Sequence, residues 1–331
     1  MLMTAVVVPD AFDQSHFANP GYRDQAEMLL RGLECNGLLL LDPDKRLLNE
    51  LSLRVEGLSM KHGQQIRIRI EEIQKKNRKR VIVAERTKCS VLPGMPLLDA
   101  AYCVQQACST DTLIVDGASQ SNLQIKGCPA AQLTSLASYI SSTFEQRRHY
   151  CHDQLPPIDK MPPGEFHDHI VRCTRFAQSL RFYDKQIGNG SSLGGFRLGI
   201  GNIIGLWAAS AHSPRASLSV EIYTCVQKTN KATDTIYSVI RDSLVRRLVA
   251  DFGIPITLFF KDDSSPPITH DRYLQTSSVA VSFSKGFDYA DEKGDGSLAL
   301  HRCAIKVDNG AHDHLYEYRK LKDHKLPLTC R

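Results

Sequence analysis

The sequence predicts an α/β protein with two domains, in which short buried strands alternate with helices. Its length of 331 residues corresponds to about two domains of ordinary size. Short apolar runs alternate with longer stretches whose apolar residues recur at helical spacing, as in a mostly parallel sheet covered by helices. Pro-Pro pairs at 156–157 and 162–163 interrupt this alternation, because proline lacks an amide donor and restricts the preceding residue. We therefore expect one domain over residues 1–150 and another over 164–331.

Strands and helices of the first domain alternate from the beginning of the chain. Residues 4–9 form an apolar run that is typical of a buried strand, and residues 38–41 form a second one. Between them, residues 22–34 carry apolar side chains on one helical face, and Asn36-Gly37 ends that helix. The same criteria predict a helix that carries Leu47, Leu48, Glu50 and Leu51, helices at 65–77, 97–107 and 130–150, and strands at 80–84 and 112–115. This alternation favours a mostly parallel sheet with flanking helices.

The second domain is also predicted to be α/β. It begins with a helix at 165–175, and a loop with several glycines is expected around 189–195. Apolar spacing predicts strands at 179–183, 218–224, 254–260 and 279–283, helices at 198–210 and 236–252, and a last strand within 297–307.

Composition indicates a soluble cytoplasmic protein. No apolar run approaches the roughly 20 residues that cross a bilayer, so no membrane span is expected. The first residues lack a basic start and lead directly into Pro9-Asp10, which favours a core strand over a signal peptide. The 10 cysteines contain no Cys-x-x-Cys pair and are typical of reduced thiols in a cytosol. The net charge of +5 permits a polyanionic partner.

Four acidic residues occupy positions where carboxylates gather in an open α/β sheet. Asp10 follows the first predicted strand, and Asp116 follows the strand at 112–115. Glu50 and Asp99 fall in predicted helices between these two strands. The carboxyl ends of parallel strands meet at the crevice where such sheets bind ligands, and carboxylates that share a site need a hard cation between them. The pattern therefore predicts a Mg²⁺ or Mn²⁺ site, and such sites usually act on phosphates.

The order of these acids also resembles a known family. Each acid taken alone is more often a solvated turn or helix residue, and Asp13, Asp24 and Asp111 are alternative ligands. The segments Val6-Val7-Val8-Pro9-Asp10, Gly37 to Glu50, Leu97-Leu98-Asp99-Ala100-Ala101 and Leu113-Ile114-Val115-Asp116 together resemble a PIN-like nuclease domain over about residues 1–125. By this resemblance, Asp10, Glu50, Asp99 and Asp116 would hold one or two divalent cations that hydrolyse a phosphodiester bond without a covalent nucleophile.

A basic segment is expected near this acidic site. It contains Lys75, Lys76, Arg78, Lys79 and Arg80, with Arg86 and Lys88 further on. One interpretation is a surface that contacts the phosphate backbone of a nucleic acid, which would make binding depend strongly on salt. The alternative is a solvated helix face whose cations pair with neighbouring glutamates.

A second candidate site lies in the C-terminal domain. Asp184 and Lys185 follow a predicted strand, and His270-Asp271-Arg272 come later in the chain. Histidine can act as nucleophile or acid, while lysine and arginine supply charge-assisted donors to a phosphate. The alternative is a polar turn that an internal ion pair holds. Ser282 and Lys285 are expected to line the same pocket.

This second set resembles the phospholipase-D-like domain at the C-terminus of MIT-domain proteins. The resemblance covers about residues 165–290 and includes Tyr183-Asp184-Lys185-Gln186-Ile187, Ile222-Tyr223-Thr224 and Gly286-Phe287-Asp288. Active enzymes of the phospholipase D family carry lysine where this chain has Arg272, and they need two such motifs. The departure favours phosphate binding by Lys185, His270 and Arg272 over catalysis.

Three functions follow from these observations. The first is a metal-dependent nuclease that cuts RNA or DNA, of the kind that serves as a bacterial defence or toxin-type effector. Such an enzyme would be controlled by a regulatory partner or an activating ligand. Its second domain would recognise a phosphate-bearing partner or promote a homo-oligomer such as a dimer. The second is a phospholipase-D-like phosphodiesterase with His270 as nucleophile, whose activity would survive EDTA. The third is a non-catalytic module that binds nucleic acid or phosphate.

Overall fold

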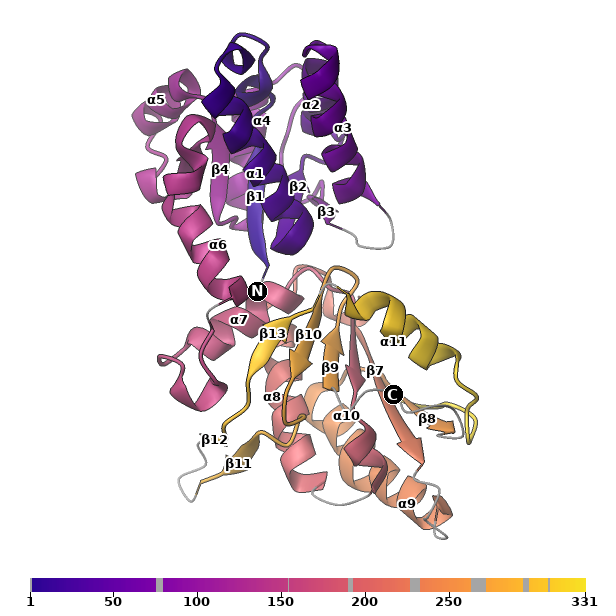
Figure 1. The fold of residues 1–331 in the computed structure, drawn as a ribbon. Coiled ribbons are helices and arrows are strands. Elements are labelled where there is room, and N and C mark those ends of the chain that lie inside the picture. Colours follow the sequence, from indigo (N-terminus) through magenta and orange to yellow (C-terminus); the bar gives the residue numbers. More distant parts are fainter. Residues whose placement is uncertain are drawn as a thin grey trace. The chain divides into compact units, whose positions relative to one another are not determined.

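The chain forms two compact units, Met1–His152 and Asp153–Arg331, and both are α/β (Figure 1). The structure is a computed structural model that describes residues 2–75, 80–153, 155–189, 193–226, 233–262, 272–293, 298–308 and 310–331. The predicted fold class is confirmed, because each unit contains one main sheet with helices packed around it. No helix within these described ranges combines the length and the apolar character needed to cross a bilayer.

The first unit contains a five-stranded sheet in which every neighbouring pair is parallel. Its strand order is β3-β2-β1-β4-β5. The strands are β1 (Met3–Val7), β2 (Gly37–Leu41), β3 (Val81–Val83), β4 (Thr112–Val115) and β5 (Leu133–Ser135). All residues of the three central strands are buried, which explains why their sequences are continuous apolar runs rather than alternating ones.

The helices of this unit connect the parallel strands. They are α1 (Pro20–Asn36), α2 (Arg46–Glu56), α3 (Met60–Gln74), α4 (Leu97–Cys108), α5 (Gly117–Ile125) and α6 (Thr143–Asp153). Right-handed crossovers place α1 and α3 on one face of the sheet, where they contact each other, and α4 on the opposite face against β1 and β2.

Strand order creates a switch point between β1 and β4. The chain leaves β1 toward β2 and β3, whereas β4 and β5 extend the sheet in the other direction. Crossover helices therefore diverge at the carboxyl ends of β1 and β4, and open α/β sheets bind ligands in the crevice at such a point. Asp10 and Asp116 follow these two strands, so the fold brings both residues to this crevice.

The prediction of one helix over 130–150 is wrong. Residues 130–141 form two short 3₁₀ helices, η3 (Ala130–Gln132) and η4 (Leu136–Ser141), on either side of β5. Leu133, Leu136 and Tyr139 recur at a spacing that imitates a helix, but Leu133 pairs with Leu113 at the edge of the sheet. The helix α6 begins only at Thr143.

The second unit is built on a seven-stranded mixed sheet with the order β13-β10-β9-β6-β7-β8-β14. Strands β6, β7 and β8 are parallel, and the other neighbours are antiparallel. The strands are β6 (Ser179–Tyr183), β7 (Ser219–Val226), β8 (Ile256–Asp262), β9 (Arg272–Gln275), β10 (Ala280–Phe283), β13 (Ile305–Val307) and β14 (Leu328–Cys330). A small separate sheet pairs β11 (Ala290–Glu292) with β12 (Leu298–Leu300).

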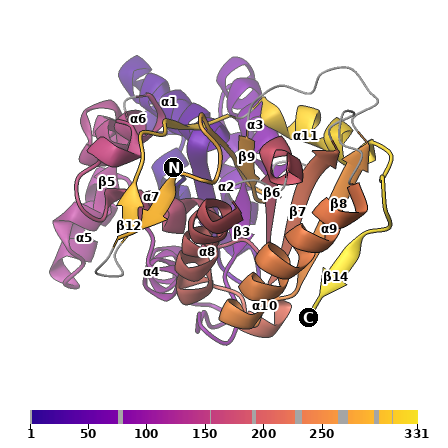
Figure 2. The same cartoon turned by 90° about the horizontal axis from the view of Figure 1, so that it is seen from below.

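Helices cover both faces of this mixed sheet. Figure 2 shows α8 (Leu193–Ser210) and α10 (Arg246–Phe252) on one side of β6, β7 and β8, and α11 (Ala311–Lys320) on the other. The remaining helices are α7 (Glu165–Thr174) and α9 (Thr233–Ile240), and a π-helical turn at Arg241–Val245 joins α9 to α10. The sequence did not predict α11 and β14, which together cover a face and an edge of the sheet.

A buried ion pair within α6 is joined to α1 through hydrogen bonds between Arg148 and Asn36. The guanidinium of Arg148 donates to both carboxylate oxygens of Glu145, at 2.6 and 2.5 Å, and also to Oδ1 of Asn36 at 2.8 Å. The hydroxyl of Tyr139 donates to the same carboxylate at 2.6 Å. Every partner in this network is buried, so removal of one charge leaves the other without compensation.

We expect Glu145→Gln to lower the free energy of unfolding by about 3–5 kcal/mol, because it leaves a buried guanidinium without its counter-charge. Equilibrium urea unfolding of the full chain measures this change. The matched control is Glu27→Gln, which breaks the exposed pair of Glu27 with Arg31 and should cost less than about 1 kcal/mol. Equal losses in the two variants would contradict a structural role for the buried network.

Candidate functional site

The turn after β1 presents two carboxylates at the crevice. Pro9 begins the 3₁₀ helix η1 (Pro9–Phe12), which buries Ala11 and Phe12 and leaves Asp10 and Asp13 partly exposed. Hydrogen bonds from Ser15 to Asp13, and then the charge of Arg54, lower the pKa of Asp13. Asp13 is therefore held ionised at neutral pH. This residue was only an alternative ligand in the sequence analysis, and the structure places it in the same cluster as Asp10 and Glu50.

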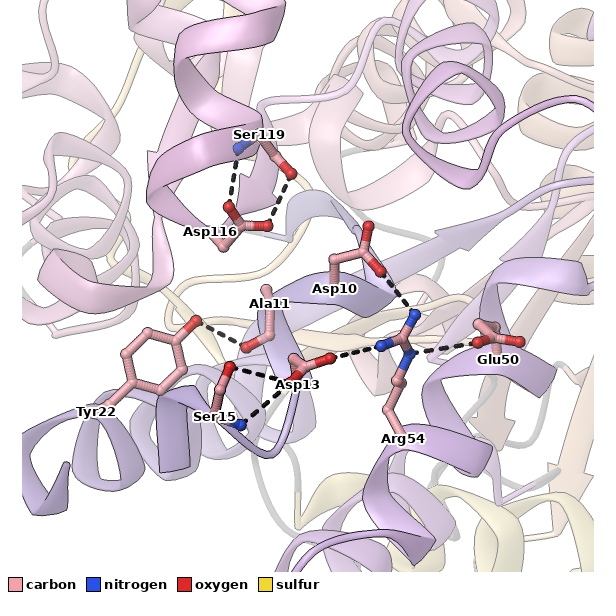
Figure 3. Close-up of polar contacts among 9 residues, drawn as sticks. All are labelled: Asp10, Ala11, Asp13, Ser15, Tyr22, Glu50, Arg54, Asp116 and Ser119. Carbon is pink, nitrogen blue, oxygen red and sulfur yellow. Dashed lines mark hydrogen bonds and ion pairs between the residues drawn. The ribbon is translucent and has the colours of Figure 1, made fainter. Parts of the chain in front are cut away.

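Arg54 on α2 joins three carboxylates (Figure 3). Its Nη2 lies 3.0 Å from Asp10, its Nη1 lies 2.6 Å from Asp13, and its Nε lies 3.3 Å from Glu50. Glu50 and Arg54 are four residues apart on α2, which places them on the same helical face. The acidic side chains from the β1 turn and from α2 therefore converge on one guanidinium. The sequence analysis did not identify Arg54.

Asp116 is a buried carboxylate that begins α5. It accepts hydrogen bonds from the backbone N–H of Ser119 at 2.8 Å and from its hydroxyl at 2.7 Å, so it acts as the N-cap of the helix. Burial, and then the charge of Asp116, raises the pKa of the nearby Tyr22, whose hydroxyl donates to the carbonyl of Ala11 at 2.7 Å. Figure 3 shows Asp10 between Asp116 and Arg54, with its second oxygen directed away from Arg54.

The remaining predicted acids lie elsewhere or have other partners. Asp99 lies in the first turn of α4 and forms an ion pair with Lys126, and none of its described contacts is with Asp10 or Glu50. Asp111 accepts hydrogen bonds from the backbone N–H and the hydroxyl of Thr4. It lies at the amino end of β4, opposite to the carboxyl end where Asp10 and Asp116 lie. Asp24 is exposed on α1. The structure therefore assembles Asp10, Asp13 and Glu50, with Asp116 buried beside them.

Asp42 shows why the position after a strand does not by itself identify a ligand. It follows β2 and is fully buried, and its two oxygens accept the backbone N–H groups of Arg46 at 3.0 Å and Leu47 at 2.9 Å. Asp42 thus binds the first two amides of α2, whose N-cap position is Lys45, whereas Asp116 is itself the N-cap of α5. Asp10 differs because its carboxylate accepts a hydrogen bond from the side chain of Arg54 rather than from the amides of a helix.

The carboxylates of this cluster are the type of ligand that a divalent cation prefers. Hard ions such as Mg²⁺ take oxygen donors, and Asp10, Asp13 and Glu50 supply them from two adjacent segments. Within the described ranges, no group of three or more histidines, cysteines or acids is arranged as a metal site. Each of the three carboxylates instead faces a different nitrogen of Arg54. The oxygen donors that a divalent ion takes are therefore present, and Arg54 pairs with them in this structure.

Two described residues of the basic segment, Lys75 and Arg80, lie at the amino-terminal end of the parallel sheet. Arg80 directly precedes β3, whereas Asp10 follows the carboxyl end of the parallel strand β1. Lys75 is exposed and pairs with Glu72, while Arg80 is only 2% exposed and donates to the carbonyl of Cys35 at 3.0 Å. Lys76, Arg78 and Lys79 lie outside the described residues. For Lys75 and Arg80, the expectation of a place near the acidic site is therefore corrected.

Two other loops place cationic side chains at the carboxyl ends of the strands, where Asp10 lies. Lys45 follows β2 and is exposed, and Arg86 follows β3 and is 73% exposed beside Asp44. Since all five strands are parallel, these two side chains lie at the same carboxyl-terminal end of the sheet as Asp10.

The predicted site of the second unit is centred on a buried carboxylate. Asp184 follows β6 and accepts the backbone N–H groups of Gln186 at 2.9 Å and Phe287 at 3.3 Å. Nε of Arg272 lies 3.8 Å from it, and a Cβ added to Gly286 would lie 2.7 Å from its Oδ2. Burial raises the pKa of Asp184 to about 6, although the two amides and Arg272 oppose this shift.

The other predicted residues of this site have different settings. Arg272 donates to the carbonyl of Ser284 at 3.4 Å as well as facing Asp184. Ser282 donates to the carbonyl of Lys306 at 3.3 Å, Lys185 begins a 3₁₀ turn, and Lys285 is exposed. His270 and Asp271 lie outside the described residues. The described part of the site is thus a buried junction of Asp184 with Arg272.

We expect Asp184 to make the stability of the chain depend on pH. Its pKa is about 6 in the folded chain and 3.8 when unperturbed, so its contribution to stability is fully present below pH 3.8 and is lost as pH rises through 6. Measured against Asp184→Asn, the free energy of unfolding of the wild type should fall by about 2 kcal/mol between pH 4 and pH 7. Urea unfolding of both proteins across this range measures the difference. A difference that stays constant with pH would refute this account of Asp184.

No protein-family model matches the chain, and neither a curated protein nor a solved structure matches it. The resemblances of the two halves to PIN-like and phospholipase-D-like domains therefore stay predictions.

Proposed function

We propose that the first unit is a divalent-metal-dependent nuclease that hydrolyses phosphodiester bonds in RNA or DNA. The observation that carries this proposal is the convergence of Asp10, Asp13 and Glu50 at the carboxyl end of β1. This point is the switch point of the sheet, where ligands of open α/β folds bind.

The residues of the crevice would divide the work of this reaction. Asp10, Asp13 and Glu50 would hold Mg²⁺ or Mn²⁺ through carboxylate oxygens, among them those that now face Arg54. When bound, the ion would polarise the scissile phosphate and lower the pKa of a water molecule. Asp116 would add negative charge beside Asp10 and fix the start of α5 through Ser119. Asp99, paired with Lys126, would not be a ligand in this arrangement.

The substrate would be a polyanion that reaches the crevice along its basic rim. Lys45 and Arg86 lie at the same edge of the sheet as the carboxylates and are exposed, so they are suited to contact phosphate groups. Binding of this kind weakens steeply as salt rises. The role of a defence or toxin-type effector, a regulatory protein partner and a homo-oligomer belong to the same proposal.

Asp10→Asn should abolish most cleavage of labelled single-stranded RNA or DNA in Mn²⁺. Removal of a group that only orients a metal ligand typically lowers activity by roughly 10–100-fold. We expect the cleavage rate of Asp10→Asn to fall by more than this, because Asp10 would itself be a ligand. EDTA should abolish cleavage by the wild type. The matched control is Asp24→Asn, because Asp24 is an exposed acid on α1 of the same unit and should leave the rate unchanged.

Other outcomes would favour the alternatives. Cleavage that survives EDTA and Asp10→Asn but is lost in His270→Ala would identify the second unit as the catalytic one. Salt-sensitive binding without cleavage under any condition would identify a binding module.

A further inference from the structure

We propose that Arg54 is an internal counter-ion that occupies the acidic crevice and must be displaced before a divalent cation binds there. This inference rests on the proposed function, since it concerns the ion that the nuclease would use. The three nitrogens of the Arg54 guanidinium each face a different carboxylate, those of Asp10, Asp13 and Glu50. A divalent ion and the guanidinium therefore compete for the same oxygens.

Arg54 cannot leave the crevice by losing its charge. The guanidinium stays protonated at any pH that a protein tolerates, so it repels a metal ion for as long as it remains in place. Three carboxylates and one guanidinium leave an excess of negative charge in the cluster. A divalent ion offsets that excess better than the single charge of Arg54 does, so it can replace the guanidinium among the same carboxylates.

The exposure of the Arg54 cluster makes displacement easy. The side chains of Arg54 and Asp10 are 33% and 42% exposed, and solvent-exposed ion pairs contribute only about 0–1 kcal/mol each. The Arg148–Glu145 pair of the same unit is the opposite case, because its side chains are only 11% and 4% exposed. The buried Arg148–Glu145 pair is a permanent part of the core, whereas the exposed Arg54 side chain can move into solvent.

The position of Arg54 on α2 allows this opening without a change of the fold. It belongs to the last turn of the helix, which ends at Glu56, and its long side chain can rotate away from the β1 turn. A guanidinium released in this way stays at the rim of the crevice, where it suits a phosphate group as well as it suited the carboxylates.

Removal of the guanidinium should therefore tighten metal binding. We expect Arg54→Met to bind Mn²⁺ about tenfold more tightly than the wild type, which corresponds to about 1.4 kcal/mol. Isothermal titration calorimetry of the full chain with Mn²⁺ alone measures this affinity without substrate or turnover. The matched control is Arg31→Met on α1, which removes an exposed ion pair with Glu27 and should leave Mn²⁺ affinity unchanged.

A double variant locates the effect. Asp10→Asn combined with Arg54→Met should lose the gain in affinity, because the added ion uses Asp10 as a ligand. If Arg54→Met fails to fold, Arg54→Lys provides the test, since its single ammonium cannot face three carboxylates and should give a smaller gain.

Two results would overturn the inference, and they can be told apart. Equal or weaker Mn²⁺ binding by the Arg54 variant, together with Asp10-dependent binding by the wild type, would refute the role of Arg54 but leave the proposed nuclease intact. Absence of Asp10-dependent Mn²⁺ binding in both proteins would refute the metal site and with it the proposed function.

Discussion

The mutual repulsion of carboxylates at the end of β1 is the constraint on which the account of this protein depends. Asp10, Asp13 and Glu50 share one crevice, and like charges at short range need a cation between them. In this structure Arg54 is that cation. Because a side-chain cation already satisfies the carboxylates, the crevice is stable without a metal ion and yet keeps the donors that such an ion would use.

The parallel sheet determines which residues can meet at this crevice. Strand order places the carboxyl ends of β1 and β4 beside each other at the switch point. Because the strands are parallel, the residue before β3 lies at the opposite, amino-terminal end of the sheet. The acidic cluster and the exposed Arg86 consequently lie at the carboxyl ends of the strands, while Lys75 lies at the amino ends. Buried ion pairs such as Arg148 with Glu145 hold the surrounding helices in place and take no part in the crevice.

Much of the fold could be predicted from the sequence, because central parallel strands are continuous apolar runs and their helices have a regular apolar face. Edge elements such as β5 and β14 could not, since they are three residues long and pair with distant strands. Asp10 was identified by its position after a strand. Arg54 was not predicted, because its contacts with Asp10 and Asp13 depend on how α2 packs against the turn after β1. The cap role of Asp116 could have been predicted, because Ser119 follows it at the spacing of an N-cap and the N3 residue of its helix.

A crystal structure of the chain soaked in Mn²⁺ tests the central claim most directly. The account predicts an anomalous difference peak bound by carboxylate oxygens of Asp10 and Glu50, with the guanidinium of Arg54 moved out to the rim of the crevice. A structure in which Arg54 still faces the three carboxylates, and in which the ion binds elsewhere or nowhere, would contradict it.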